Sequence, residues 1–371
     1  MCSLFWKTSY LAALTVLVSG PLTLLCHAAD PTAEQQYMLE LLNRMRMAPA
    51  AELDKLVNLV DANTWDSLKS DHLTVASALN FYGVNATELT SQWSTLTSAP
   101  PLAWNDSLAA ASVSYSNLMV NTDTQAHGLD GLTVGQRIVN AGYSSAWGDS
   151  AQTLFATAAD VTHAHTALAI DWGPDGGSGT GIQPGATHRA ALMDPLFKEI
   201  GIGFQTVSIP ISNVEVAGPI AVTQHLANHL TSNGVSIISD AILTGSIYND
   251  SLLDDDFYTP GEGIGGALVF VYDNSTGQMV ASGQTNSVGG FNIALTGLTD
   301  GSTFRVEAPE TGQSAQNFAL IARQENYGSV SSPVIVTLYD NVYASFVAVP
   351  EPGSAALMLF AGLVALRRKR P

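Results

Sequence analysis

His188 is the first residue whose surroundings suggest chemistry. It stands before Arg189 in the stretch GATHRAALMDPLFKEIGIGF, residues 185–204, after a turn of small residues. A neutral imidazole is a common ligand of divalent metal ions, and an imidazole beside an acid can act as a general base. Arg189 can pair with an acid or end the turn. The stretch alone therefore leaves open whether His188 is a working residue or a surface one.

Two further pairs of histidines have spacings that can place both side chains on one face. His163 and His165 would share a face of a strand, but the Ala, Thr and Leu around them favour a solvated helix, where the two diverge. His225 and His229 have the four-residue spacing of helical metalloprotease motifs. Leu226 stands where such a motif needs its glutamate base, and VTQHLA predicts a strand. We therefore exclude a metalloprotease motif there.

An acidic loop, YNDSLLDDDFYTPGEGIGG at residues 248–266, offers several carboxylates at short spacing. Calcium takes six to eight oxygen ligands, so we predict a calcium site formed by Asp250, Asp254, Asp256 and Glu262. The loop lacks the spacing of an EF-hand. It resembles the calcium-binding B-type repeats of bacterial surface adhesins. The alternative is a solvated acidic turn, but clustered carboxylates repel one another without a cation, which favours the calcium site.

Both ends of the chain have the composition of targeting segments. Residues 1–29 combine Lys7, an apolar run and CHAA, which predicts a signal peptide that also removes both cysteines, Cys2 and Cys26. Residues 349–371 combine Pro-Glu-Pro, an apolar run of 12 residues and a basic end. That run is too short to span a bilayer alone. The tail resembles the PEP-CTERM sorting signal of Gram-negative bacteria that make exopolysaccharides.

The tail and the charge define the expected partners. The PEP-CTERM resemblance implies processing by exosortase and transient membrane association through the tail. It also implies an exported protein of the cell envelope or extracellular space, with exopolysaccharide or other envelope components as candidate partners. The net charge of −18 repels polyphosphate, so nucleic-acid binding is disfavoured, whereas cation binding is compatible with it.

The hydrophobic pattern divides the chain into two domains of an α+β protein. Helical spacing predicts helices at 31–47, after Pro49, and from Asn105 or Asp106. Strand-like segments begin at Ile200. After Asp240 the helical periodicity stops, and short strand-like pieces separated by Gly, Asn and Asp predict a small antiparallel β-sandwich over 240–347.

Five stretches of the first domain occur in a recognisable order: MLELLNRMRMAPAAEL, PLAWNDSLAAASVSYSNLM, AHGLDGLTVGQRIVNAGY, HRAALMDPLFKEIGIGF and VTQHLA. Together they resemble the CAP superfamily of cysteine-rich secretory proteins, antigen 5 and plant pathogenesis-related proteins, in its disulfide-free bacterial form. The resemblance implies an α-β-α sandwich over 30–235 with a cleft that holds two histidines and acids. It places the histidines at His127 and His188 and the family glutamate at Asp149. Asp171 is the candidate for the second acid, and Glu199 matches a strand position that we interpret as structural.

These residues define the functional alternatives. Two neutral imidazoles and a carboxylate can hold zinc or another divalent metal ion if water completes the shell. We predict an exported cell-envelope or extracellular-matrix protein whose CAP-like cleft binds a metal or ligand. The alternative is a metal-dependent hydrolase of peptide or ester bonds that uses His127, Asp149 and His188. Neither arrangement supplies a nucleophilic side chain, and the sequence leaves open whether the protein is an enzyme.

Overall fold

The computed structural model describes residues 30–348, except 62–63, 68–71, 208–216 and 233–235. The predicted signal peptide and sorting tail lie outside the described residues. Within the described ranges, no helix combines the length and the apolar character that a membrane span requires.

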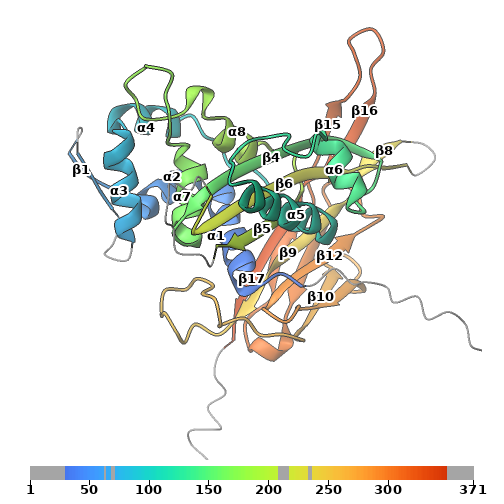
Figure 1. Ribbon diagram of the computed structural model, residues 1–371. Coiled ribbons are helices and arrows are strands. Elements are labelled where there is room, and N and C mark those ends of the chain that lie inside the picture. The colour runs from blue at the N-terminus through green and yellow to red at the C-terminus, as the bar shows by residue number, and fades with distance from the viewer. Residues whose placement is uncertain (1–29, 62–63, 68–71, 208–216, 233–235, 349–371) are drawn as a thin grey trace, which may run out of the picture.

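The first domain is a three-layer α-β-α sandwich (Figure 1). Its central sheet has the strand order β3-β5-β6-β4, in which β3 runs parallel to β5 and the other pairs are antiparallel. Helices α5 and α6 pack on one face, and α1, α7 and α8 pack on the other. The elements of these layers are α1 (Ala33–Met47), β3 (Ala103–Trp104), α5 (Asp106–Thr122), α6 (Val134–Asn140), β4 (Trp147–Ala158), α7 (Val161–Ile170), α8 (Thr187–Met193), β5 (Glu199–Thr206) and β6 (Ile220–His229).

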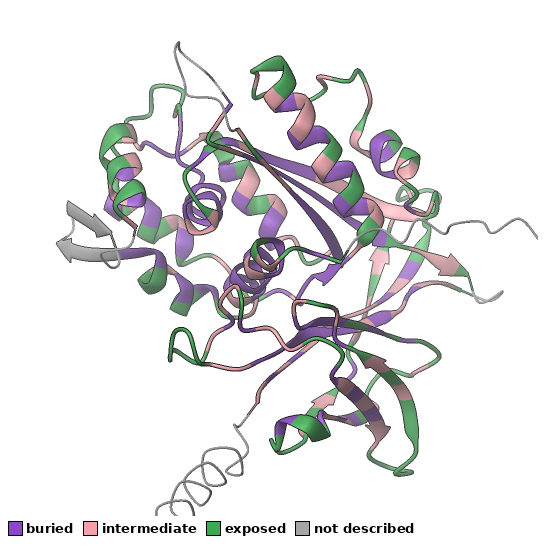
Figure 2. Ribbon diagram, turned by 60° about the horizontal axis from the view of Figure 1, so that its bottom comes forward, coloured by how far each residue is buried: buried purple, intermediate pink, exposed green. Residues whose placement is uncertain are grey.

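Smaller elements complete this domain at one end of the sheet. They are α2 (Pro49–Leu56), the hairpin of β1 (Val57–Asp61) and β2 (Thr64–Ser67), α3 (Leu73–Tyr82), α4 (Ala86–Trp93) and a short 3₁₀ turn, η2 (Pro184–Ala186). The main core lies between the sheet and α1, α7 and α8, and Figure 2 shows its buried residues in purple.

Two glycines of the GIGF stretch allow α5 to lie directly on the sheet. A Cβ atom on Gly201 would stand 1.9 Å from the backbone nitrogen of Ala109, and one on Gly203 would stand 2.3 Å from the backbone of Ser112. Such distances are far below van der Waals contact, so only glycine fits at these positions. The alternation of Gly with Ile200 and Ile202, which face the main core, therefore sets the two faces of β5.

The second domain consists of strands, with an apolar core of its own. Two sheets of orders β11-β10-β13-β14 and β12-β9-β17 form the sandwich, and a third sheet, β15-β16-β8-β7, continues from the end of β6. The strands are β7 (Thr231–Ser232), β8 (Ile237–Ser239), β9 (Ala241–Tyr248), β10 (Leu268–Asp273), β11 (Met279–Gln284), β12 (Gly290–Leu295), β13 (Thr303–Glu307), β14 (Gln316–Ala319), β15 (Ala322–Asn326), β16 (Ile335–Tyr339) and β17 (Val342–Val347), with a 3₁₀ turn η3 (Pro309–Thr311). Most pairs are antiparallel, but β9–β17 and β8–β16 are parallel.

Helix α1 connects the two domains through a buried carboxyl group. Glu40 is 2% exposed, and it accepts hydrogen bonds from Gln36 Nε2 at 2.7 Å and from the hydroxyl of Tyr343 on β17. Burial raises the pKa of Glu40 above its ordinary value, with smaller opposing contributions from its hydrogen bonds. Asn341 Nδ2 donates hydrogen bonds to the backbone carbonyls of Pro101 and Lys198. The interface between the two domains is therefore polar as well as buried.

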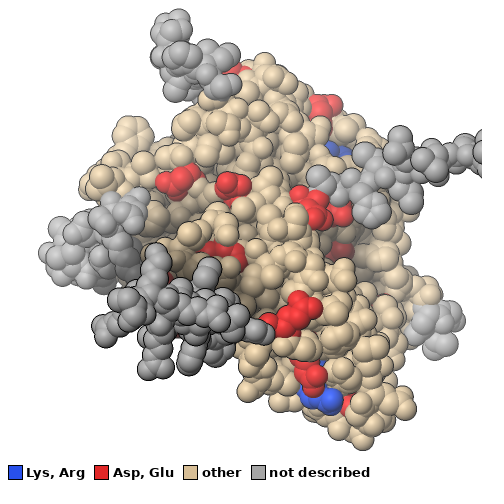
Figure 3. All heavy atoms as spheres, turned by 90° about the horizontal axis from the view of Figure 1, so that it is seen from below, with Lys and Arg blue, Asp and Glu red and all other residues tan. Residues whose placement is uncertain are grey.

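The structure confirms the α+β class, the three predicted helices and the strand at VTQHLA. One expectation about exposure was wrong. His163 and His165 do lie on a helix, α7, but they are 8% and 1% exposed rather than solvated, because α7 packs into the main core. On the face that Figure 3 shows, Asp and Glu side chains outnumber Lys and Arg, in keeping with the acidic composition.

Candidate functional site

His188, at the start of α8, is held by Asp171 at the end of α7. Asp171 is fully buried and has a left-handed backbone, with φ of 62°. Its Oδ1 accepts from His188 Nδ1 at 2.7 Å, and its Oδ2 accepts from the backbone amide of His188 at 2.8 Å. Gln183 Nε2 donates to the same Oδ1 at 2.9 Å. Because a carboxylate only accepts, His188 carries a proton on Nδ1, and its Nε2 is the nitrogen left for a ligand.

A cavity of about 240 Å³ adjoins His188 at the edge strand β4. Its walls include Leu154, Phe155 and Thr157 of β4 and the indole of Trp172. Gln125, two residues before His127, also lines it, and the Gln125 side chain accepts from the amide of Ala156 on β4 at 2.8 Å. The loop that carries His127 therefore borders the cavity that contains His188.

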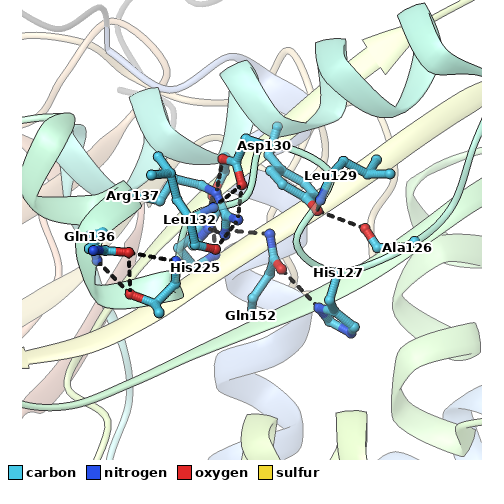
Figure 4. A network of polar contacts seen from close by, with 12 residues as sticks. Ala126, His127, Leu129, Asp130, Leu132, Gln136, Arg137, Gln152 and His225 are labelled. Atoms are coloured by element: carbon cyan, nitrogen blue, oxygen red, sulfur yellow. Dashed lines mark hydrogen bonds and ion pairs between the residues drawn. The ribbon is translucent and has the colours of Figure 1, made fainter.

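His127 ends a network of polar side chains on the α5 side of the sheet (Figure 4). Its Nδ1 lies 2.8 Å from Gln152 Oε1, and Gln152 Nε2 lies 3.3 Å from Nε2 of the fully buried His225. Gln152 and His225 are direct neighbours across β4 and β6, which places both side chains on one face. The imidazole of His127 itself is exposed.

Arg137 and Asp130 form the other end of this network. The guanidinium donates to both carboxylate oxygens of Asp130, at 2.7 and 2.8 Å, and its Nη1 donates to His225 Nε2 at 3.2 Å. The hydrogen bond from Arg137 lowers the pKa of Asp130 to about 2. Burial, together with the charge of Arg137, lowers the pKa of His225 to about 3, so this ring is neutral.

Asp149 lies where the first domain contacts the second domain. Its backbone amide donates to Asn228 Oδ1 at 2.7 Å, and its side chain is hydrogen-bonded to Tyr327, which follows β15. Burial raises the pKa of Asp149 above its ordinary value. The register of β4 shifts between Trp147 and Ser150, which changes how this residue projects from the strand. Among the contacts of the described residues, Asp149 reaches neither cleft histidine.

Comparison with known proteins decides the family of the first domain. Residues 39–208 match the profile of the cysteine-rich secretory protein family, CAP. This segment is a CAP domain. The CAP domain has the α-β-α layers that the resemblance implied, with His127 and His188 in the matched range. No curated protein matches the chain.

Two solved structures are similar to part of this chain. An extracellular protein containing an SCP domain from Bacillus anthracis is 17% identical with a TM-score of 0.25, and the match covers 44% of this chain and 45% of that one. An outer surface protein from Borrelia burgdorferi is 16% identical with a TM-score of 0.26, and the match covers 41% of this chain and 92% of that one. This chain thus spans less than half the length of the Bacillus protein.

The described part of the CAP domain does not bring together a complete set of protein ligands for a metal ion. In the described part of the chain, no three His, Cys, Asp or Glu side chains lie close enough together to hold a metal ion. Nε2 of His127 and of His188 are nonetheless the type of donor that zinc, copper and nickel prefer. A metal bound there needs water or ligand atoms for the rest of its coordination shell.

The other polar candidates of the CAP domain have structural contacts. Arg189 is buried and donates to the carbonyls of Ala169 and Ile170 at the end of α7. Glu199 accepts from Asn105 Nδ2 at 2.7 Å and from the Tyr143 hydroxyl at 2.6 Å, which supports its structural interpretation.

The acidic loop of the second domain is closed by hydrogen bonds to its own backbone. Glu262 is fully buried, and its Oε1 accepts from the amides of Ser251, Leu252 and Leu253 at 2.7–3.2 Å. Its Oε2 accepts from the amide of Thr259 at 3.0 Å. Four amide donors therefore use this carboxylate, and it does not fit the role of a calcium ligand.

The aspartates of this loop are placed differently. Asp250 accepts from the amides of Asp255 and Asp256 at 3.2 and 3.0 Å, and it is half-buried, whereas Asp254 and Asp256 are exposed. Asp256 has a left-handed backbone, with φ of 56°. The calcium site stays a prediction for these three residues.

Gln152 is the site residue that sequence reasoning missed. The family pattern predicts an acid just after Gly148. It does not predict any role for a glutamine three residues after Asp149. Gln152 becomes visible once β4 and β6 are in register, because it then lies opposite His225. Asp171 was only a candidate for the second acid, because the insertion between Trp172 and His188 leaves that family position without a clear match; its contact with His188 comes from the structure.

Proposed function

We propose that this chain is an exported binding protein whose CAP domain binds a divalent metal ion, or a small ligand, through His127 and His188. The observation that supports it most is the way in which Asp171 holds His188 by Nδ1. Histidines that bind metals usually donate the other ring N–H to a carboxylate or carbonyl oxygen, which fixes the ring and the tautomer. Gln152 Oε1 stands in the matching position against His127.

A metal such as zinc would supply a Lewis acid with open positions when it is bound there. The residues of the chain contribute the two nitrogen donors and the walls of the cavity beside β4. The apolar side of that cavity, Leu154, Phe155 and Trp172, would exclude water from part of a bound ligand.

The alternative function is hydrolysis of a peptide or ester bond by the same cleft. The His188–Asp171 pair supports it, because an imidazole that is oriented by a buried carboxylate is the arrangement of a general base. In this alternative the nucleophile is water, and Asp171, rather than Asp149, is the acid partner of the base.

Metal analysis of the purified mature protein tests both functions. We expect zinc to bind the wild type and to bind His127→Ala and His188→Ala at least tenfold more weakly. His229→Ala is the matched control, because His229 is an exposed histidine of the same domain that contacts the ring of Tyr143. Equal zinc binding in all four proteins would contradict the proposal. Turnover of peptide or ester substrates that is lost in His188→Ala would favour the hydrolase.

We also propose export and processing at the two ends. The composition of residues 1–29 and the PEP-CTERM-like tail at 349–371 support it, with exosortase as the processing partner and exopolysaccharide or another envelope component as the surrounding matrix. The mass of the mature protein from a producing bacterium tests this. A mature chain that begins at Met1 and ends at Pro371 would contradict it.

Calcium binding by the second domain is a separate proposal. The exposed carboxylates of Asp254 and Asp256, next to Asp250, support it. Calcium is expected to raise the melting temperature of the wild type, and Asp254→Asn is expected to reduce that shift. An unchanged melting temperature on addition of calcium or of a chelator would remove the site.

A further inference from the structure

The hydrogen bonds that link His127, Gln152, His225 and Ser112 all have the same donor direction, from His127 toward Ser112. Ser112 has a single hydroxyl proton, and its Oγ donates that proton to the carbonyl of Gly201 at 2.8 Å. The same Oγ lies 2.8 Å from Nδ1 of His225, and both residues are fully buried. Since the serine proton is already used, Nδ1 of His225 must donate to Oγ.

The other nitrogen of His225 is therefore an acceptor. Two donors point at Nε2 of this ring, Arg137 Nη1 at 3.2 Å and Gln152 Nε2 at 3.3 Å. A guanidinium cannot accept a hydrogen bond, which agrees with an unprotonated Nε2. Asp130 fixes the guanidinium by two hydrogen bonds, so the position of this donor is also set.

The orientation of the Gln152 amide follows from this. Its nitrogen is directed to His225, so its oxygen is directed to His127, where Oε1 lies 2.8 Å from Nδ1. Because Oε1 can only accept, the proton of a neutral His127 lies on Nδ1, and Nε2 carries a lone pair. We propose that Gln152 is a positioning residue that, through this network, holds His127 as an electron-pair donor at Nε2.

The tautomer of His127 limits the chemical classes of ligand that the site can bind. Asp171 imposes the same tautomer on His188, so both cleft histidines present a lone pair at Nε2. Such a pair suits a divalent metal ion or a ligand with N–H or O–H donors. It does not suit a ligand that offers only acceptors, such as an anion. The ligand class rests on the proposed function, whereas the tautomer of His127 does not.

Nitrogen-15 NMR of the imidazole rings in the metal-free mature protein tests the proposal directly. The wild type is expected to show His127 with its proton on Nδ1. An unconstrained imidazole favours the proton on Nε2, so Gln152→Ala is expected to shift His127 toward that form. Gln152→Glu keeps an acceptor oxygen and is expected to retain the Nδ1 proton. His188 is the internal control, because Asp171 holds it in all three proteins.

A titration with zinc separates this proposal from the proposed function. Gln152→Ala is expected to weaken zinc binding by about 10- to 100-fold, the usual effect of removing such a partner, and Gln152→Glu to restore most of it. A wild-type His127 with its proton on Nε2 would overturn the proposal, even if Gln152→Ala does not fold. If the wild type has the expected tautomer but binds no zinc, the positioning role stands and the metal function fails.

Discussion

Asp171 binds His188 twice, through the side chain at 2.7 Å and through the backbone amide at 2.8 Å. A single buried carboxylate thus fixes both the first turn of α8 and the ring that borders the cavity. Its third hydrogen bond, from Gln183, uses the remaining capacity of Oδ1. The site and the local fold therefore depend on the same side chain.

We expect Asp171→Ala to lower the free energy of unfolding by about 3 kcal/mol, because it leaves three partly buried donors without a partner and puts alanine at a left-handed backbone position. Asp171→Asn tolerates that backbone and is expected to cost about 1 to 2 kcal/mol. Denaturant unfolding measures both. In a double-mutant cycle with His188→Ala, the costs are expected to be less than additive. Strict additivity would show that Asp171 acts independently of the His188 ring.

The sequence predicted the parts of the structure that depend on local periodicity and on family order. Helices α1, α2 and α5 begin close to the expected residues, and the family order indicated His188, whereas it offered Asp171 only as a candidate for a second acid. Contacts that depend on strand register were not predictable. Gln152 and Asp149 lie three residues apart on β4, yet one contacts His127 and the other contacts Tyr327.

The burial of individual side chains could not be predicted from local sequence patterns either. A run of Ala, Thr and Leu around His163 and His165 is compatible with either an exposed or a buried helix, and only packing against the sheet decides. Likewise, Glu262 looks like a calcium ligand in sequence, but its oxygens are used by four backbone amides that the loop brings together after folding.

Gly201 is expected to be intolerant of any side chain. Its added Cβ would meet the backbone of α5 rather than a flexible side chain, so the helix would have to move away from β5. We expect Gly201→Ala to cost more than about 3 kcal/mol of unfolding free energy or to prevent folding. Gln205→Ala on the same strand is the control, with an expected cost below about 1 kcal/mol. A well-folded Gly201→Ala of wild-type stability would contradict this packing.

The unfolding free energy is expected to depend on pH through Glu40. Because burial raises the pKa of Glu40 in the folded protein, the unfolded chain loses this proton at a lower pH than the folded chain does. The contribution of Glu40 to the free energy of unfolding is therefore fully present below its ordinary pKa of 4.5. This contribution is lost as the pH rises through the pKa that Glu40 has in the folded protein. Glu40→Gln removes this loss. We expect it to stabilise the protein at pH 8 by about 1 kcal/mol or more and to change stability little at pH 4.

Denaturant unfolding at the two pH values tests the role of Glu40. Glu34→Gln is the matched control, since Glu34 lies on the same helix but is exposed. Its effect is expected to be within about 0.5 kcal/mol at both pH values. An equal effect of Glu40→Gln at pH 4 and pH 8 would show that the buried carboxyl does not titrate in this range.

Glu262 is expected to stabilise its loop with or without calcium. In Glu262→Gln an amide nitrogen replaces one acceptor oxygen and faces backbone N–H donors, so at least one partly buried donor loses its partner. We expect a loss of about 1 to 3 kcal/mol of unfolding free energy, equal in calcium and in a chelator. Asp254→Asn, on the exposed side of the same loop, is expected to cost less than about 0.5 kcal/mol in the chelator. A defect of Glu262→Gln that appears only in calcium would instead make Glu262 a ligand, because the amide contacts alone do not depend on the cation.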